Sequence, residues 1–237
     1  MRLKPNISVI VPTFNQEKYL GRCLRSLIYQ TIDRHEYEII VINDGSNDKT
    51  KFVSNLFKDE IKIINNKKNM GLPHAINQGI LAAKGRFIVR VDSDDYVNKE
   101  FLNIPFNYLV YNSDIDAVSC DYYLVDDKET VIKRENSEKK PVGCGIMFRV
   151  EHLLDLGLYD KSFLVHEDKD LRYRFLKKYK INRIPLPLYR YRKHDKNITN
   201  NKYKMRKHLK KLKKKHDLKK IWNLILKALK VEIGLIL

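Results

Sequence analysis

Short runs of β-branched residues alternate with helical patterns through the first half of the chain, and this alternation limits the possible folds more than any other feature. Residues 7–11 are typical of a strand that Pro12 ends, and residues 17–30 place apolar side chains at the spacings of a helix face. The same patterns predict strands at 37–42, 61–64 and 86–91 and helices at 48–57 and 71–84. This order predicts an α/β fold with a Rossmann-like, mostly parallel sheet and helices on both faces.

Clusters of polar residues follow three of these predicted strands. Residues 13–15 come after the first strand, residues 43–46 after the second, and residues 92–95 after the fourth. In parallel α/β sheets, ligands bind in a crevice beyond the carboxyl ends of the strands. The three clusters therefore predict one site for a polar ligand.

The last cluster places the carboxylates of Asp92, Asp94 and Asp95 within four positions. Carboxylates this close raise one another's pKa unless a cation lies among them, and Mg²⁺ or Mn²⁺ takes oxygen ligands of this kind. The alternative is a solvated helix N-terminus, where Asp residues are also stabilised. The position directly after a buried strand favours the metal site.

Beyond about residue 113 the pattern indicates a smaller mixed half laid against the same crevice. Strands are predicted at 116–119, 122–125 and 189–192, and helices at 150–156 and 167–178, with Pro185 and Pro187 between the last helix and the last strand. We expect one domain over residues 1–201, with halves at 1–112 and 113–201, followed by a helical tail at 202–237.

The tail carries most of the net charge of +18, because residues 202–220 contain eleven Lys and Arg against one Asp. An apolar stripe follows, and a basic stretch beside an amphipathic helix is typical of binding to anionic lipid surfaces. The alternative is a helix that packs on its own domain or on a second subunit, as in a homodimer. The basic residues do not form a platform with regularly interleaved aromatic residues, so the pattern does not favour nucleic acid.

The three cysteines, Cys23, Cys120 and Cys144, lie far apart without metal-ligand spacing, as in a reduced cytoplasmic protein. The apolar run at 7–11 is too short for a signal peptide, and no stretch approaches the roughly 20 apolar residues of a membrane span. We therefore expect a cytoplasmic location, with any membrane contact peripheral, on the inner face.

The first half also resembles the family 2 glycosyltransferases, which have the GT-A fold. The matching segments are Val11-Pro-Thr-Phe-Asn15, Glu38-Ile-Ile-Val-Ile-Asn-Asp-Gly-Ser46, Asn69-Met-Gly71 and Asp92-Ser-Asp-Asp95. The likeness departs at Asn43, where many members have Asp, and continues more loosely to about residue 197. The resemblance implies a nucleotide-sugar glycosyltransferase that inverts the configuration of the transferred sugar.

The resemblance implies roles for particular residues. Asp92, Asp94 and His194 would bind Mg²⁺ or Mn²⁺, although His194 could equally be an exposed side chain among basic neighbours. UDP is the nucleotide that the family suggests. The donor would also contact further residues, namely Pro12, Thr13, Asn15, Asp44, Lys68, Asn69, Asp92 and Ser93. Lys68 and Arg90 could contact phosphate or simply be surface charges.

The segment from Glu167 to Arg174 resembles the family's motif for the catalytic base. The resemblance implies that Asp168 takes the proton of the acceptor hydroxyl, with Glu167 as its neighbour and substitute. Acids at a helix start could also act only on the helix dipole. The expected acceptor is a glycan or a lipid-linked sugar in surface polysaccharide synthesis, and no motif identifies the sugar or the linkage.

Two other functions compete with this interpretation. A sugar nucleotidyltransferase has a related α/β sheet, but a glycine-rich phosphate loop would follow its first strand, where this chain has Pro12-Thr-Phe-Asn15. A non-catalytic protein that binds anionic lipid through the tail is the second alternative.

Overall fold

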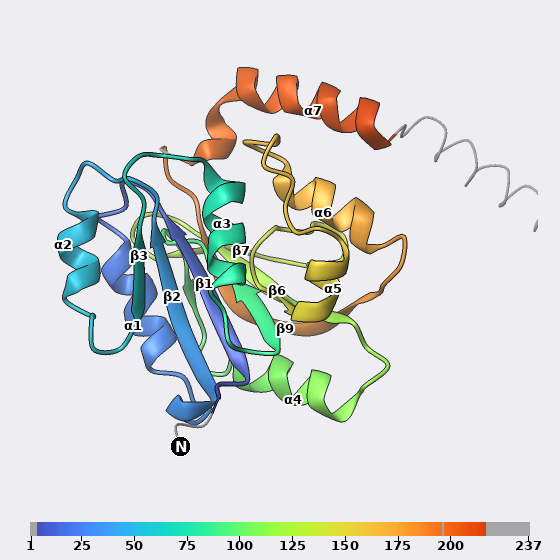
Figure 1. Ribbon diagram of the computed structural model, residues 1–237, viewed down its shortest axis with the longest axis horizontal. Coiled ribbons are helices and arrows are strands. Elements are labelled where there is room, and N and C mark those ends of the chain that lie inside the picture. Colours follow the sequence, from blue (N-terminus) through green and yellow to red (C-terminus); the bar gives the residue numbers. More distant parts are fainter. Residues whose placement is uncertain (1–3, 196, 217–237) are drawn as a thin grey trace, which may run out of the picture.

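The computed structural model describes residues 4–195 and 197–216 (Figure 1). In the first half, the strands β1 (Ile7–Thr13), β2 (Tyr37–Asn43), β3 (Lys62–Asn65) and β4 (Phe87–Arg90) lie parallel in the order β3-β2-β1-β4. The helices between them are α1 (Leu20–Ile28), α2 (Thr50–Asn55) and α3 (Leu72–Leu81), and a short 3₁₀ helix, η1 (Arg34–Glu36), precedes β2. The predicted parallel α/β arrangement is confirmed, although each of the three α-helices is shorter than its sequence pattern.

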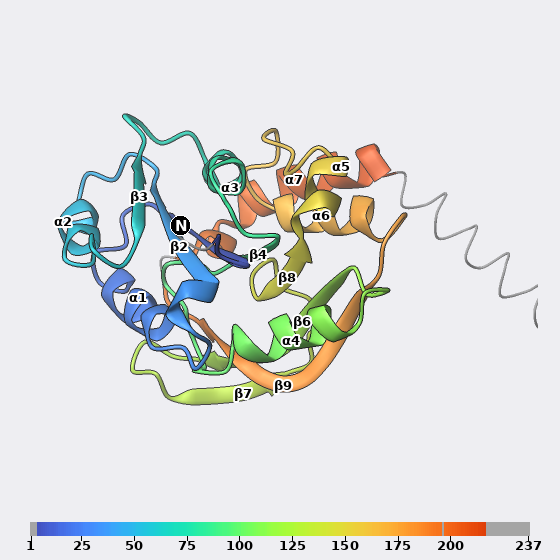
Figure 2. The ribbon, with the colours of Figure 1, turned by 60° about the horizontal axis from the view of Figure 1, so that its bottom comes forward.

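Alternate residues of the strands face two hydrophobic cores, because successive side chains of a strand point to opposite faces of the sheet. Val9 and Val41 belong to the core on the α1 side, whereas Ile10 and Ile42 belong to the core on the α3 side. The first core also contains residues of α4 (Asn103–Tyr111), and the second contains residues of α5 (Val150–Asp155) and α6 (Glu167–Phe175) (Figure 2). Helices therefore cover both faces of the sheet.

The second half continues the same sheet with mixed strand directions. β8 (Ile146–Arg149) runs antiparallel to β4, and β6 (Ala117–Val125) runs antiparallel to β8. β9 (Ile181–Arg192) is parallel to β6, while β7 (Val131–Glu135) and β5 (Tyr96–Val97) pair antiparallel with β6 and β9. The nine strands form one sheet, so the two predicted halves share one continuous framework.

Two predicted strand limits are wrong at prolines. β1 continues through Pro12, which lies beyond the last residue of β1 that pairs with β4, so its missing N–H removes no hydrogen bond to β4. The strand predicted at 189–192 begins at Ile181 and contains Pro185 and Pro187, and its register with β6 shifts across these residues. The sequence pattern also predicts neither α4 nor β8.

The last described helix, α7 (Lys202–His216), packs on α6 and on His166, the residue that precedes α6. The carbonyl oxygen of Met205 lies 3.2 Å from Nε2 of His166, and Nε2 of His216 lies 2.8 Å from Oδ1 of Asp170. Lys215 forms an ion pair with the same carboxylate at 2.7 Å. The buried residues of this helix are His208, Leu212 and His216.

The described part of the basic tail, residues 202–216, therefore packs on protein. The apolar stripe of the tail begins at Leu218 and lies outside the described residues, so both interpretations of that stripe stay predictions. No helix among residues 4–195 and 197–216 is long and apolar enough to cross a membrane.

Asp121 links β6 to the neighbouring β9 and to the loop after β7. Its buried carboxylate accepts hydrogen bonds from Nε and Nη2 of Arg183, from Nη2 of Arg134 and from the backbone N–H of Ser137. Burial by itself would raise the pKa of Asp121, but these donors outweigh it and lower the pKa to about 2.

We expect Asp121→Asn to lower the free energy of unfolding by about 2 kcal/mol at pH 7, because a carboxyl pKa depressed in the folded state stabilises that state. This contribution is present above about pH 4 and is lost as the pH falls toward 2. Urea unfolding at pH 7 and pH 3 should therefore show a smaller difference between the wild type and the variant at the lower pH. The exposed Asp114 provides the control Asp114→Asn. A difference that does not change with pH would contradict the assignment.

We expect Leu212→Ala to loosen α7, because truncating a buried leucine costs about 2–5 kcal/mol and Leu212 is 1% exposed. Limited trypsin digestion with mass spectrometry should detect faster cleavage within the lysine-rich residues 202–216. Tyr203→Ala is the matched control, because Tyr203 lies on the same helix and is 78% exposed. Equal cleavage rates for the two variants would show that α7 does not depend on this contact.

Candidate functional site

A cavity of about 620 Å³ lies at the carboxyl ends of β1, β2 and β4. The three polar clusters therefore meet around one space, as the order of the strands predicts. Of the residues predicted to contact a ligand, the cavity wall contains Pro12, Thr13, Asp44, Asn69, Asp92, Ser93 and Asp94.

Asp44 lines this cavity and also forms hydrogen bonds with the loop that makes part of its wall. Its two carboxylate oxygens accept hydrogen bonds from the side chain of Asn66 and from the backbone N–H groups of Met70 and Gly71, at 2.8 to 3.0 Å. These bonds join the end of β2 to the loop before α3. Asp44 is 3% exposed, so only a small part of this side chain faces the space where a ligand would lie.

Asn15 and Lys68 do not line the cavity, and they organise loops around it instead. Asn15 has a positive φ of 52°, and its Oδ1 accepts a hydrogen bond from the backbone N–H of Asn47 at 3.0 Å. The side chain of Lys68 is exposed, and its backbone lies so close to Gly45 that a Cβ at that position would be 2.4 Å from the carbonyl carbon of Lys68. Gly45 also has a positive φ of 73°, which favours glycine.

Asp92 faces the cavity while its carboxylate is held by Arg90. Nε and Nη2 of Arg90 donate to the two oxygens of Asp92 at 2.6 and 3.1 Å, and Nη1 donates to Glu167 at 3.0 Å. Arg90 is 7% exposed, so its interpretation as a surface charge is wrong. Burial raises the pKa of Asp92, and the charge of Arg90 opposes that effect.

Asp94 is paired with His194, which follows β9. Nε2 of His194 lies 2.9 Å from Oδ2 of Asp94, and the His194 side chain is 4% exposed. The alternative interpretation of His194 as an exposed side chain is therefore wrong. Two of the three predicted metal ligands, Asp94 and His194, lie together. Tyr19 packs against the imidazole with ring centroids 4.8 Å apart.

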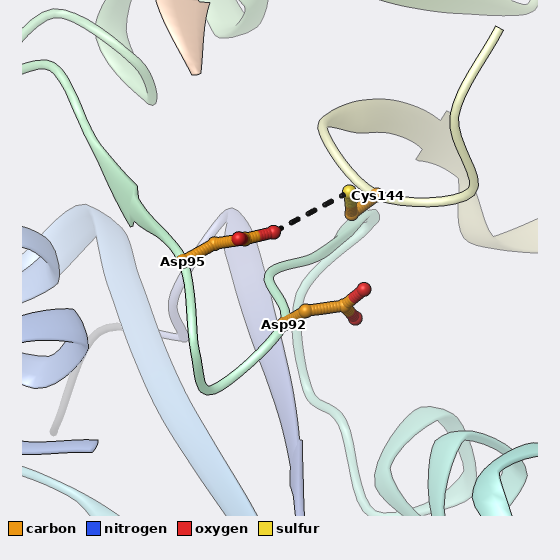
Figure 3. Close-up of side chains that lie close together, drawn as sticks. All are labelled: Asp92, Asp95 and Cys144. Atoms are coloured by element: carbon orange, nitrogen blue, oxygen red, sulfur yellow. Dashed lines mark hydrogen bonds between the residues drawn. The ribbon is translucent and has the colours of Figure 1, made fainter. Parts of the chain in front are cut away.

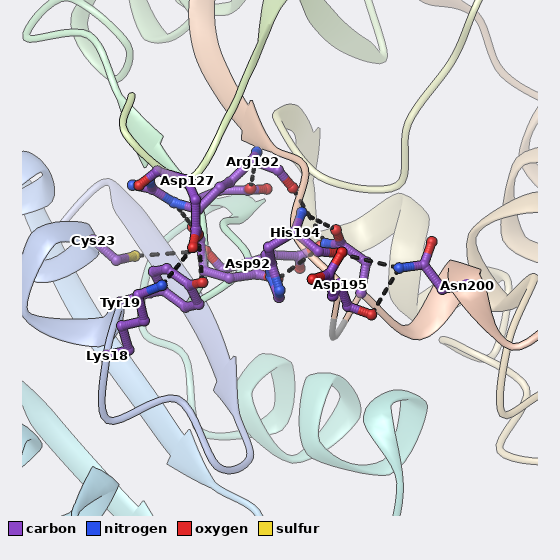
Figure 4. Close-up of polar contacts among 12 residues, drawn as sticks. Lys18, Tyr19, Cys23, Asp92, Asp127, Arg192, His194, Asp195 and Asn200 are labelled. Atoms are coloured by element: carbon purple, nitrogen blue, oxygen red, sulfur yellow. Dashed lines mark hydrogen bonds and ion pairs between the residues drawn. The ribbon is translucent and has the colours of Figure 1, made fainter. Parts of the chain in front are cut away.

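Arg192 encloses this part of the site. Its Nε donates to the carbonyl oxygen of Asp94 at 2.9 Å, and its Nη2 forms an ion pair with Glu129 at 3.0 Å. Figure 4 shows this group of polar contacts, in which the hydroxyl of Tyr19 donates a hydrogen bond to Asp127. The loop between β6 and β7, the end of β9 and the start of α1 thus contact one another beside the acidic cluster.

Asp95 is buried and belongs to the framework. Its oxygens accept hydrogen bonds from the hydroxyl of Tyr189 and from the backbone N–H of Arg192, both at 2.7 Å, and Asp95 points toward Cys144 (Figure 3). Burial and the neighbouring Asp94 and Asp92 raise the pKa of Asp95 well above its ordinary value. This carboxyl group therefore connects β9 to the acidic turn.

Ligand atoms of Asp92, Asp95 and Cys144 lie within 4.8 Å of one another, but these residues do not suit Mg²⁺ or Mn²⁺. Burial raises the pKa of the Cys144 thiol well above its ordinary value, and sulfur prefers softer cations. Asp92 and Asp94 in the cavity wall provide carboxylate oxygens, the ligands that these ions take, and Asp94 lies beside His194. The chemistry of these two carboxylates fits the predicted metal. Asp92 is held by Arg90 and is not paired with His194, so the full set of Asp92, Asp94 and His194 stays a prediction.

Glu167 and Asp168 begin α6 and occupy different environments. Burial raises the pKa of Glu167 to about 7, against the opposing charge of Arg90. Asp168 is half-buried in the wall of a second cavity of about 40 Å³, beside Gly143 and Tyr159. A Cβ at Gly143 would lie 2.5 Å from Cβ of Asp168, so the close approach of these two chains requires glycine. The more solvent-accessible Asp168 is the better placed of the two to receive a proton.

The sequence analysis missed several residues of the cavity wall, among them Leu164, Tyr191, Asn197, Ile198 and Lys204. Lys204 is the notable one, because it brings a positive charge from α7 to a cavity lined by carboxylates. The basic tail pattern signalled its charge but not its position. The predicted boundary after residue 201 falls just before this helix.

Comparison with known proteins identifies the family. The model for glycosyl transferase family 2 matches residues 8–222. A poly(ribitol-phosphate) beta-glucosyltransferase of Bacillus spizizenii is 39% identical over 114 residues, which cover 46% of this chain and 18% of that protein.

Two solved structures share the fold. S. aureus TarS 1–349 in complex with UDP-GlcNAc has a TM-score of 0.71 and 23% identity, covering 83% of this chain and 61% of that one. The mannosyltransferase PcManGT of Pyrobaculum calidifontis, in complex with GDP-Man and Mn²⁺, has a TM-score of 0.68 and 17% identity, covering 87% and 62%. The chain thus spans less than two thirds of each of these relatives, and the predicted GT-A fold is confirmed. Because the family match extends over most of its length, the chain belongs to glycosyl transferase family 2.

Proposed function

We propose that this glycosyltransferase moves a sugar, with inversion, from a nucleoside diphosphate sugar to a hydroxyl of a glycan or lipid-linked acceptor in surface polysaccharide synthesis, with UDP as the nucleotide. The observation that carries the proposal is the single cavity in which Thr13, Asp44 and Asn69 meet Asp92 and Asp94. TarS, which shares the fold, binds UDP-GlcNAc, and this supports a nucleotide-sugar ligand.

In this mechanism the wall residues at the ends of β1 and β2 bind the nucleotide. Asp92, Asp94 and His194 would hold Mg²⁺ or Mn²⁺. When bound, such a cation neutralises charge that gathers on the leaving diphosphate. The complex of PcManGT with GDP-Man and Mn²⁺ supports a metal-assisted reaction of this kind.

Asp168 acts as the general base. The acceptor oxygen forms a bond to the anomeric carbon while the bond from that carbon to the diphosphate oxygen breaks. The hydroxyl proton passes to a carboxylate oxygen of Asp168, and the bonding electrons leave with the diphosphate. Glu167 is held by Arg90 at 3.0 Å, and its raised pKa suits it less well as a base that must be ionised at neutral pH.

The family assignment favours glycosyl transfer over the nucleotidyltransferase alternative. Membrane association through 202–237 and a homodimer stay predictions, since residues 217–237 lie outside the described residues and α7 packs on α6. The Bacillus relative is named for poly(ribitol-phosphate), and this supports an acceptor in surface polysaccharide synthesis.

We expect the purified chain with Mn²⁺ to release nucleotide from at least one of UDP-glucose, UDP-GlcNAc and GDP-mannose, and to lose this activity in excess chelator. Asp94→Asn should lower the rate by about 100-fold or more, because it removes a charged metal ligand. Asp195→Asn is the matched control, since Asp195 is an exposed aspartate that directly follows His194. Release of nucleotide at the wild-type rate by Asp94→Asn, or in chelator, would refute the metal role.

We expect Lys204→Ala to weaken UDP binding by about tenfold, the usual effect of losing one charge-assisted hydrogen bond. Lys204 lines the cavity, and in this proposal its ammonium contacts the diphosphate. Titration calorimetry with UDP and Mn²⁺ measures the effect. Lys207→Ala is the control, because Lys207 is exposed on the same helix and does not line the cavity. Equal losses for the two variants would indicate only a general effect of charge.

A further inference from the structure

We propose that Arg90 is a positioning residue that links the donor site to the helix carrying the base. The inference rests on the proposed function, because it assigns Asp92 to the donor side and Asp168 to the acceptor side. Arg90 would fix Asp92 with one edge of its guanidinium and the first turn of α6 with the other.

The contacts of Arg90 use three of its nitrogens. Nε and Nη2 bind the two oxygens of Asp92, and Nη1 binds Oε1 of Glu167. The side chains of Arg90 and Glu167 are 8% and 6% exposed, so this ion pair is almost completely removed from water. Removing one partner of a buried ion pair is strongly destabilising, because the other charge is left buried and unpaired. The side chains of Asp92, Arg90 and Glu167 are therefore kept in one arrangement.

The geometry requires arginine. A planar guanidinium can bind one carboxylate with two nitrogens and a second carboxylate with the third, whereas a lysine ammonium is a point charge on a flexible chain. Arg90 is the last residue of β4 and Asp92 lies two positions beyond it, so the contact between these two side chains is local. Glu167 is 77 positions further along the chain. The bridge formed by Asp92, Arg90 and Glu167 therefore spans the two halves of the domain.

The bridge matters for Asp168 because that residue directly follows Glu167. The turn that carries both acids is held from the β4 side by Arg90 and from the α7 side by His166, whose Nε2 lies 3.2 Å from the carbonyl oxygen of Met205. His166 has a positive φ of 63°, so the chain enters α6 through a sharp local bend. Fixing Glu167 therefore fixes the direction in which Asp168 leaves the helix.

The test compares Arg90→Lys, Glu167→Gln and the double variant with the wild type in the full chain. The readouts are nucleotide release with Mn²⁺ from UDP-glucose, UDP-GlcNAc or GDP-mannose, and the Kd of UDP. We expect each single change to lower kcat by about 100-fold, as misplacement of a catalytic group does. Glu167 does not line the donor cavity, so Glu167→Gln should change the Kd of UDP by less than about threefold. The double variant should be no slower than the slower single variant, because the two residues act through one contact.

Arg174→Lys is the matched structural control. Arg174 also binds a carboxylate on α6, that of Asp170 at 2.9 Å, and it donates to the carbonyl oxygens of Leu156 and Leu158. This variant should lower Tm and leave kcat close to the wild-type value. A kcat of Arg90→Lys that falls no further than that of Arg174→Lys, or additive effects in the double variant, would overturn the inference.

A second measurement does not depend on activity. Amide hydrogen exchange of the metal-free protein should become faster at residues 167–170 in Arg90→Lys, and unchanged exchange there would overturn the inference. If the wild type releases nucleotide from none of the three donors, the proposed function fails, while faster exchange still establishes the bridge.

Discussion

The carboxylates of Asp92, Asp94 and Asp95 lie within four positions at the end of β4, and their mutual repulsion has to be balanced for this turn to fold. Arg90, the last residue of β4, neutralises Asp92. Asp95 accepts a hydrogen bond from the backbone of Arg192 at the end of β9, and Asp94 is paired with His194 just after β9. The acidic turn therefore holds the second half of the domain against the first. The groups that would bind a ligand also determine how the two halves pack.

The parallel half could be predicted from the sequence because its strands are apolar on both faces and its helices have a clear periodicity. The second half was harder, since its contacts join distant segments. β9 contains two prolines that suggest a break, but its register shift with β6 accommodates them. The basic pattern of α7 does not reveal that Asp170 of α6 binds both Lys215 and His216 of that helix. No local pattern reveals such partners.

The acidic turn and its neighbouring strand ends could be found from the sequence, but the role of each side chain could not. Asn15 and Lys68 belong to the right loops and contribute to loop geometry rather than to the cavity wall. Arg90 could not be distinguished from a surface charge, because its second partner is Glu167, 77 positions away. Spacing along a strand predicts which side chains share a face, not which distant residue packs against them.

The position of Lys204 gives α7 a thermodynamic role. A ligand that contacts Lys204 binds more tightly to the form of the protein in which α7 is docked. The two equilibria are linked. If docking of α7 strengthens ligand binding by a given free energy, ligand binding stabilises the docked helix by the same amount. A molecule that binds the basic face of α7 and draws the helix away from the domain would then weaken ligand binding without contacting the acidic turn.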